Sequence, residues 1–425
     1  TKVSNVSVSG TENGAVIKAS GQVEITEGES ILAGGFISEA EGVQIADSHV
    51  TNLKAVYAEA AKDKEGYAGG FVGRSHTGGL AGLAQEDKDG ALKLPGIVNV
   101  SGLLDLVPYL IPQYTNTTVT FCSANEEPQV KADYAGGFFG EMQSGKVDNS
   151  TRTEAYAVYG LEKVKGESHA GGFAGKVDAG ATASSNGLNL LGGILNLDIG
   201  QLLDVLQVYI PIIQSAGVKS TEKGFTVEAT DTDSYAGGYL GYGGGVQIKD
   251  SDVTSLKHTK VTPPGDSLES ANGDSYFGTD SQYAVKGGKY AGGYAGCVDI
   301  DSAAAVGGGL KLLGNIELTN LLKALDVVAS TIENSDVNGC VGGYSVLADG
   351  RDDKNQKLGK AGGFIGEMSG TIIKNSDANL FNYIIGREAA GGYAGIMEPG
   401  NVASVIEDAG ILDGLLNVTD SLASL

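Results

Sequence analysis

A short phrase recurs along most of the chain. It is Ala-Gly-Gly followed by an aromatic residue, and in every copy but the first another Gly stands two positions after the aromatic. The eight copies place the following residues: Gly34, Gly35 and Phe36; Gly69, Gly70 and Phe71; Gly136, Gly137 and Phe138; Gly171, Gly172 and Phe173; Gly237, Gly238 and Tyr239; Gly292, Gly293 and Tyr294; Gly362, Gly363 and Phe364; Gly391, Gly392 and Tyr393. Cys340-Val-Gly-Gly-Tyr344 is a weaker ninth copy. Such repetition is typical of stacked similar units rather than of one globular core.

The spacing of the copies has two levels. The first and second copies are 35 residues apart, as are the third and fourth, whereas the second and third are 67 residues apart. A large unit is therefore a pair of copies with a long second half, and its period is 102, then 101, then 125 residues. We divide the chain into a lead-in or cap of short strands at 1–32 and repeat units at 33–134, 135–235, 236–360 and 361–425. Unit three carries a polar loop at 257–288, and unit four is truncated.

A second phrase lies between the copies. It is a Gly, a few alternating β-forming residues, and then Asp or Asn followed by Ser, as in Gly42-Val-Gln-Ile-Ala-Asp-Ser48 and Gly245-Val-Gln-Ile-Lys-Asp-Ser251. The pattern predicts a short strand running into a turn, because Asp and Asn tolerate a left-handed backbone or bond their own backbone. Strands of three to five residues with turns at fixed steps favour an all-β fold, a right-handed parallel β-helix, in which 35 residues would hold about two circuits.

The recurrent phrase has a structural role in such a fold. Equivalent residues of successive circuits lie about 4.8 Å apart and stack in register. We therefore expect the aromatic residue, and the Tyr that precedes Ala-Gly-Gly in four copies, to point inward and form ladders. The glycines would supply either a positive-φ corner or room for the aromatic ring against the backbone. A phosphate-binding loop is not supported, since no copy continues into Gly-Lys-Ser/Thr and a helix.

Leucine-rich segments occupy the second half of each unit, and Leu103, Leu202, Leu321 and Leu415 correspond in them. Apolar residues follow helical spacing in 201–212 and in 320–328. We expect a short amphipathic helical insert in each unit, packed along the flank of the β-helix. A helix that binds a partner or a membrane surface is the alternative, because each has one apolar stripe.

Composition restricts the partners. The net charge of -23, from 29 basic and 52 acidic residues, argues against nucleic acid and anionic membrane surfaces. No apolar run reaches the roughly 18 residues of a spanning helix, so we expect no membrane insertion in this segment. Cys122, Cys297 and Cys340 make no disulfide framework or zinc motif and are interpreted as small buried residues. We expect an extracellular protein of a bacterial cell surface, with signal and anchor outside this segment.

No catalytic or metal constellation stands out. None of His49, His76, His169 and His258 forms an i, i+4 pair, and His169 takes the Tyr position before Ala-Gly-Gly. The densest oxygen-rich turn contains Asp349, Asp352, Asp353 and Asn355. Calcium is the cation such a turn would suit, although the EF-hand order and the calcium-binding nonapeptide are missing. We expect no cofactor and no enzymatic activity, and we interpret the acidic turns mainly as solvated surface.

The Tyr-Ala-Gly-Gly-Phe-x-Gly copies, such as Gly69-Gly70-Phe71-Val72-Gly73, resemble the GLUG-type repeat of glycine-rich bacterial surface proteins. The resemblance covers the copies between 33 and 395 but not the leucine segments. It implies a surface-attached, adhesive protein and carries over no catalytic residue.

We therefore predict a non-enzymatic stalk or adhesin that presents a face to a host glycan or an extracellular protein. A polysaccharide-processing β-helix enzyme and a filament self-associating through its end circuits are the alternatives. Binding is expected on the parts that depart from the phrase, namely the loop 257–288 and the leucine segments.

Overall fold

The described part of the chain is built from β-strands. A computed structural model describes residues 1–21, 30–60, 64–77, 111–125, 127–178, 210–259, 261, 282–299, 329–351 and 357–399, and the backbone of β10 (Gln85–Glu86) and β11 (Leu92–Lys93). Within these ranges no helix occurs, and all strands pair in parallel except β10 with β11. The predicted all-β class is confirmed at the level of parallel sheets.

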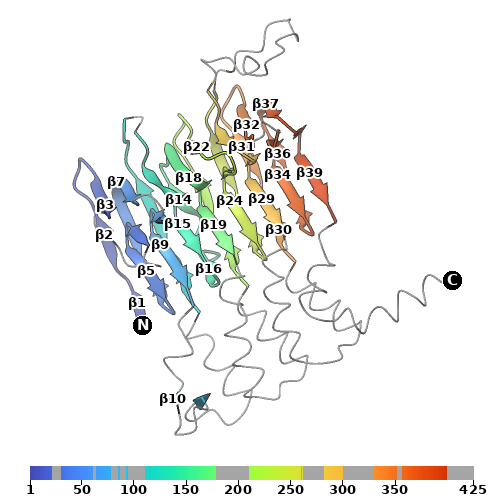
Figure 1. The fold of residues 1–425 in the computed structure, drawn as a ribbon. Helices are drawn as coiled ribbons and strands as arrows, with labels where there is room; N and C mark the ends of the chain where they lie inside the picture. Colours follow the sequence, from blue (N-terminus) through green and yellow to red (C-terminus); the bar gives the residue numbers. More distant parts are fainter. Residues whose placement is uncertain are drawn as a thin grey trace, which may run out of the picture.

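Two narrow sheets of eight strands lie along the molecule (Figure 1). Sheet A contains β1 (Lys2–Ser4), β6 (Gln44–Ala46), β12 (Gln113–Thr115), β16 (Lys146–Asp148), β20 (Ile212–Gln214), β25 (Gln247–Lys249), β30 (Thr331–Glu333) and β35 (Ile372–Lys374). Sheet C contains β5 (Ile37–Glu41), β9 (Val72–His76), β15 (Phe139–Met142), β19 (Ala174–Asp178), β24 (Leu240–Gly244), β29 (Ala295–Asp299), β34 (Ile365–Ser369) and β39 (Ala394–Glu398).

Sheet B is wider and has 21 strands. Its strands are β2 (Ser7–Ser9), β3 (Ala15–Ser20), β4 (Ile31–Gly34), β7 (His49–Glu59), β8 (Gly66–Gly69), β13 (Thr118–Phe121), β14 (Val130–Gly136), β17 (Tyr156–Tyr159), β18 (Lys163–Gly171), β21 (Gly217–Lys219), β22 (Thr226–Ala229), β23 (Tyr235–Gly237), β26 (Val253–Leu256), β27 (Val285–Gly287), β28 (Tyr290–Gly292), β31 (Val337–Gly339), β32 (Tyr344–Ala348), β33 (Lys360–Gly362), β36 (Ala378–Asn379), β37 (Phe381–Gly386) and β38 (Ala389–Gly391).

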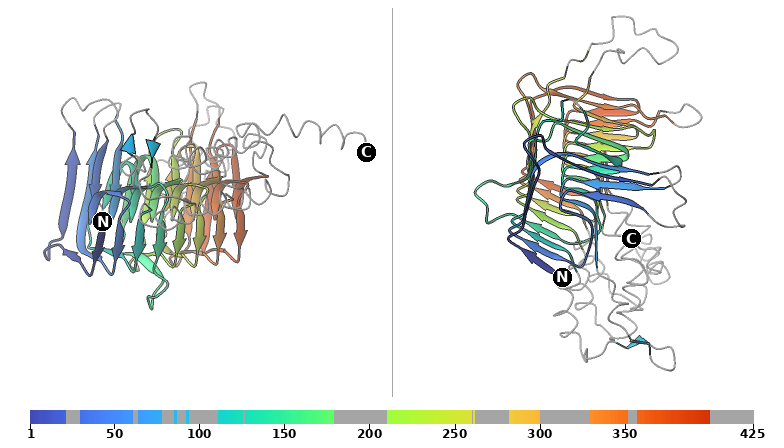
Figure 2. Two further views of the ribbon diagram at one scale, coloured as in Figure 1. Left: turned by 90° about the horizontal axis from the view of Figure 1, so that it is seen from below. Right: turned by 90° about the vertical axis from the view of Figure 1, so that its left-hand side faces the viewer.

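The chain visits sheets A, B and C in that order eight times, and we call each passage a circuit. The circuits lie side by side in sequence order, from the blue N-terminal strands to the red β39 (Figure 2). Ala33 pairs with Ala68, and Ala68 with Ala135, so each copy of the phrase marks one circuit. The expectation of two circuits per 35 residues was wrong, because strands are longer than assumed: β7 has 11 residues and β18 has nine.

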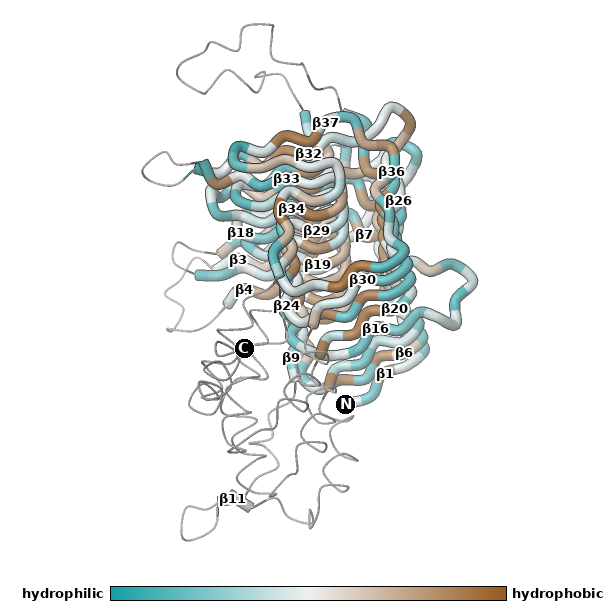
Figure 3. Tube along the Cα trace, turned by 90° about the vertical axis from the view of Figure 1, so that its right-hand side faces the viewer, coloured by the Kyte–Doolittle hydropathy of each residue, from teal (hydrophilic) through white to brown (hydrophobic). Residues whose placement is uncertain are grey.

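The phrase forms the corner between sheets B and C. In seven of the eight copies its Ala belongs to the core, and its aromatic residue follows the corner and points inward. Phe36, Phe71, Phe138, Phe173, Tyr239, Tyr294, Phe364 and Tyr393 form one continuous stack with ring centroids 4.7–5.4 Å apart. The hydropathy tube shows the same regularity, with brown segments side by side at β34, β29 and β19 (Figure 3).

Close backbone packing explains the paired glycines. The Gly-Gly pairs of the eight copies all have ordinary φ, so the positive-φ corner is not used. A Cβ added to Gly69 would lie 1.8 Å from the carbonyl oxygen of Val72, and one on Gly70 would lie 2.1 Å from that of Gly137 in the next circuit. Any side chain at either position would overlap main-chain atoms. The glycines thus make room mainly for backbone.

The weak ninth copy is not equivalent to the others. Gly342 and Gly343 have φ of 101° and 83° and lie in a turn before β32, away from the corner between sheets B and C. Tyr344 is paired with Phe381 rather than with an aromatic residue of the phrase. A similar sequence therefore forms a different structure here, a turn with a left-handed backbone.

The Asp/Asn-Ser phrase forms the corner between sheets A and B, as predicted. Asp47, Asp250 and Asn334 have φ of 46°, 51° and 50°. The following Ser is buried and links circuits: Ser335 Oγ donates to the carbonyl of Glu333 at 2.9 Å and accepts the N–H of Ser251 at 3.1 Å. A hydroxyl in this position satisfies two backbone groups that would otherwise be buried without a partner.

The two-level period has a structural origin. Four long segments, 78–110, 179–209, 300–328 and 400–425, each follow a sheet C strand in every second circuit. In the other circuits sheet C leads into sheet A within two or three residues. The predicted helical inserts fall on these long segments and lie outside the described residues. One boundary is corrected: Ile212, placed at the end of the insert 201–212, begins strand β20.

Candidate functional site

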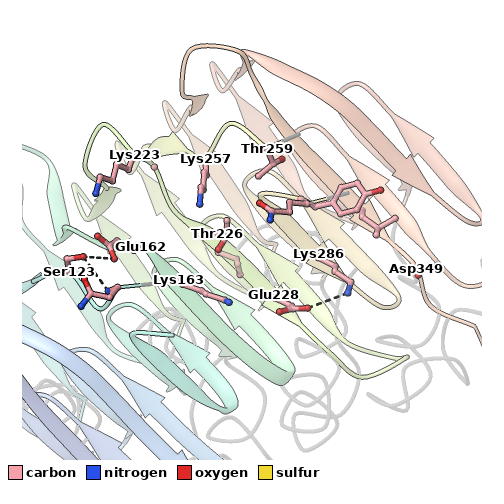
Figure 4. A pocket seen from close by; sticks show the side chains of 16 residues that line it. Ser123, Glu162, Lys163, Lys223, Thr226, Glu228, Lys257, Thr259, Lys286 and Asp349 are labelled. Atoms are coloured by element: carbon pink, nitrogen blue, oxygen red, sulfur yellow. Dashed lines mark hydrogen bonds and ion pairs between the residues drawn. The ribbon is translucent and has the colours of Figure 1, made fainter. Parts of the chain in front are cut away.

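A groove of about 840 Å³ lies on the outer side of sheet B and crosses several circuits (Figure 4). We call it the lysine groove. It is lined by Ser123, Asn125, Glu162, Lys163, Lys223, Gly224, Thr226, Val227, Glu228, Lys257, Thr259, Gln282, Tyr283, Lys286, Leu347 and Asp349. Its volume is in the range of ligand-binding sites.

Strand alternation builds the floor of the groove. Val164, Val227 and Val285 point into the core and are fully buried. Their neighbours in sequence must point to the opposite face of sheet B. The outward residues of β18, β22 and β27 therefore include Lys163 and Lys286, which are half-buried.

Turns between the strands of sheet B build the opposite wall. The turn before β22 supplies Lys223 and Gly224, and the chain after β26 supplies Lys257. Gly224 has a φ of 73°, and a Cβ there would lie 2.7 Å from the Cα of Lys257. Glycine thus allows the turn of one circuit to pack on the chain of the next, which places the two lysines on one wall.

The carboxylates of the groove are already engaged. Glu162 accepts hydrogen bonds from the Ser123 hydroxyl at 3.1 Å and the Ala124 N–H at 3.3 Å. Glu228 pairs with Lys286 at 3.3 Å and more distantly with Lys165 at 3.9 Å. Asp349 pairs with Arg387.

Three cations of the groove have no such partner. Within the part of the chain that the structure describes, Lys163, Lys223 and Lys257 form no ion pair. The Thr259 hydroxyl belongs to the same lining, is buried and has no hydrogen-bond partner among the described residues. The groove therefore offers positive charge that a bound anion would neutralise.

The groove lies partly where binding was expected. The predicted loop 257–288 is described only at its two stems, and both stems line the groove, through Lys257 and Thr259 on one side and Gln282 to Lys286 on the other. The glycines and aromatic residues of the phrase build the interior, and none lines the groove. Lys163 and Lys223 were not singled out in the sequence, because nothing in their local context distinguishes them from other exposed lysines.

A second aromatic ladder runs along the outer face of sheet B. Tyr67, Tyr134, His169, Tyr235 and Tyr290 stack with ring centroids 4.6–4.9 Å apart. The alanines that follow them belong to the core, so these rings lie on the opposite face of the strand. The expectation that the Tyr points inward was wrong, since period-two alternation cannot put both Tyr and Ala inside.

His169 takes the place of a Tyr in this ladder, and this makes the stability of the folded state sensitive to acid. Burial, and to a lesser degree the charge of Lys176, lower the pKa of His169 to about 3. Unfolded histidine has a pKa near 6.5. As pH falls below 6.5 the unfolded chain takes up a proton that the folded chain excludes, so stability is lost.

His169→Tyr should therefore protect the protein against acid. We expect nearly equal stability of variant and wild type at pH 7.5, and about 3 kcal/mol in favour of the variant at pH 4. Urea denaturation at the two pH values checks this. An equal gain at both would show that packing, and not protonation, is responsible.

Asp133 shows the opposite pH dependence. Burial and the neighbouring Glu167 carboxylate raise the pKa of Asp133 to about 6. The hydrogen bond that the Gly66 N–H donates to Asp133 Oδ2 at 2.5 Å acts in the opposite direction and lowers this pKa. The folded state thus retains a proton that the unfolded state releases near pH 4, and this stability is lost as pH rises through 6.

Asp133→Asn should remove that loss, because the amide keeps an oxygen for Gly66 and is neutral. We expect a gain of about 1 kcal/mol at pH 7.5 and none at pH 4, the value being reduced by partial solvent exposure. Thermal melts from pH 4 to 8 measure it. A variant destabilised at pH 7.5 would contradict the assignment.

The other candidate residues are dispersed. His49 Nδ1 lies 2.9 Å from Thr118 Oγ1, His76 pairs with Glu39 at 3.1 Å, and His258 Nδ1 lies 2.9 Å from the carbonyl oxygen of Gly343. The three cysteines are free thiols, and Cys297 is buried. Among the described residues no group of three or more His, Cys, Asp or Glu side chains could hold a metal ion.

Two predictions extend beyond the described ranges. Of the oxygen-rich turn proposed for calcium, Asp352, Asp353 and Asn355 lie outside the described residues. A search of the described residues for a helix long and apolar enough to cross a membrane found none.

Comparisons with protein-family models, with curated proteins and with solved structures found no match to this chain.

Proposed function

We propose that this chain is a right-handed parallel β-helix with short amphipathic helical inserts, belonging to a GLUG-type bacterial surface protein. We propose further that it acts without catalysis, as an extracellular stalk or adhesin whose lysine groove binds a host glycan or extracellular protein. The observation that carries the binding proposal is the set of three lysines without an ion pair in a groove whose carboxylates are all engaged.

The scaffold suits this role because it holds the groove in shape. Strands in eight circuits pair in register, and the ring stack runs through all of them. A preformed groove loses little conformational freedom on binding, so more of the contact free energy contributes to affinity.

A binding screen with matched variants tests the proposal. Wild type, a groove variant (K163Q/K223Q/K257Q) and a control (K146Q/K249Q/K374Q) would be applied to arrays of glycans and matrix proteins. The control lysines are exposed on sheet A and give the same change in net charge. We expect wild type and control to bind a common ligand, and the groove variant to bind at least about tenfold more weakly. Equal binding by all three would exclude the groove.

A second candidate function is polysaccharide cleavage, favoured by the adjacent carboxyl groups of Asp133 and Glu167. A carboxylic acid with a pKa of about 6 is suited to general-acid catalysis of glycoside hydrolysis. Reducing-end assays on a polysaccharide panel decide: activity lost in both Asp133→Asn and Glu167→Gln would support an enzyme, and absence of turnover would reject it.

Self-association through the end circuits is a further proposal for partners. Large exposed apolar residues concentrate in the first and last circuits, where Val16 is 55%, Leu380 59% and Met397 60% exposed. Light scattering at rising concentration tests it, and a strict monomer would reject it.

A further inference from the structure

We infer that the lysine groove binds a linear acidic glycan, with a carboxylate or sulfate group on successive sugar units, lying parallel to the direction in which the circuits stack. The inference rests on the proposed function and specifies the chemistry of its ligand.

The placement of the cations gives the direction. Lys163 belongs to the fourth circuit, Lys223 to the fifth, and Lys257 and Lys286 to the sixth. Adjacent parallel strands lie about 4.8 Å apart, which is comparable to the length of one sugar unit in an extended polysaccharide. A chain along the groove would therefore meet at least one lysine for each sugar it passes.

The charge balance selects an acidic ligand. Glu228 and Asp349 are paired with cations and Glu162 accepts two hydrogen bonds, so among the described residues Lys163, Lys223 and Lys257 are the groove cations without an ion pair. The chain as a whole carries -23 and repels polyanions. That repulsion is screened beyond about 8 Å at physiological salt, whereas contacts inside the groove are not. An acidic glycan is thus attracted to the lysine groove although the chain as a whole is negatively charged.

The neutral lining favours a glycan over an acidic peptide. Thr226 and Gln282 supply a hydroxyl and an amide group that match sugar hydroxyls. The two aliphatic lining residues, Val227 and Leu347, are 0% and 2% exposed, so they form no pocket for an apolar side chain. Peptide binding depends on such anchors.

Calorimetry with defined oligomers tests the inference. The probes are oligogalacturonates of two to six units, a sulfated glycosaminoglycan hexasaccharide, a neutral glucan hexamer and poly-glutamate. We expect affinity to rise up to about three units, the number of circuits that carry the groove lysines, and then level off. A threefold rise in salt should weaken binding about tenfold, by release of counterions from a polyanion contacting three cations. The carboxylated and sulfated arms show which acidic group fits.

The variants distinguish the contribution of the lysine charges to binding from that of the shape of the groove. The groove variant should lose about 30-fold in affinity, the sheet A control should change less than about twofold, and K163R/K223R/K257R should retain binding. If the triple variant fails to fold by circular dichroism, Lys223→Gln alone, at an exposed position, should still lose about threefold in affinity.

Each outcome is decisive. Equal binding of the neutral glucan would overturn the acidic assignment, yet the groove would remain a binding site for glycans. Equal binding of poly-glutamate would point to a protein partner. Acidic glycan binding that is unchanged in the groove variant would place the site elsewhere. Failure of every ligand in the broad screen would reject the proposed function itself.

Discussion

Gly172→Ala should be among the most damaging single-methyl changes at the described glycines. The added Cβ would lie 2.0 Å from the carbonyl oxygen of Gly238 in the next circuit and 2.9 Å from Phe225 Cε2. Both atoms belong to tightly packed, paired segments, so relief requires moving one circuit away from its neighbour. We expect a loss of at least about 3 kcal/mol or failure to fold, measured by urea denaturation followed by circular dichroism.

Gly392→Ala is the matched control, because Gly392 takes the same position in the last circuit. Among the described residues the nearest atom to its Cβ is Phe381 Cζ at 3.5 Å, an ordinary contact. A change within about 0.5 kcal/mol is expected. Similar losses at Gly172 and Gly392 would mean that the following circuit does not determine the need for glycine.

Phe173→Ala should have a comparably large effect through the ring stack. Phe173 is fully buried, with its ring centroid 5.4 Å from that of Phe138 and 4.8 Å from that of Tyr239. Truncation leaves a cavity with rings on both sides, which neighbouring circuits held by strand pairing cannot close. The expected loss is about 3–5 kcal/mol, read from the midpoint and slope of chemical denaturation.

Phe36→Ala tests the same chemistry at the end of the stack. Phe36 is half-buried and stacks on a single ring, that of Phe71 at 4.8 Å. The Phe36 ring buries less apolar surface on folding than a fully buried ring does, and its removal leaves no enclosed cavity. We therefore expect a loss of about 1–2 kcal/mol in stability. If the end and the middle of the stack cost the same, the rings would act as independent core residues instead of a ladder.

The sequence indicated most of what depends on repetition. Identical residues at regular steps predicted parallel stacking, and the ring stack and the polar corners follow directly from it. The length of a circuit was misjudged because turn signals were counted as strand ends, whereas β7 runs through such a position: Asn52 within it has a φ of 54°. The side on which Tyr67 lies was also misjudged, although the adjacent core Ala68 implies it.

The groove could not be predicted, for a physical reason. Lys163, Lys223 and Lys257 stand 60 and 34 residues apart, and only the pairing of circuits brings them to one surface. Which lysines lack an acidic neighbour is equally a property of register, because Glu228 and Lys286 meet across two strands. Neither fact leaves a local pattern in the chain.

The uneven corner between sheets C and A suggests a practical use. Residues 143–145 join β15 to β16, while residues 77–112 join β9 to β12, yet β12 and β16 pair in uninterrupted register. The stack therefore tolerates a twelvefold difference in connection length at this point without a shift of strands. Residues 143–145 are buried, whereas the equivalent short corner at 370–371 is half-buried. We therefore expect the corner at 370–371 to accept a foreign epitope or a small folded domain, which would turn the stack into a display scaffold.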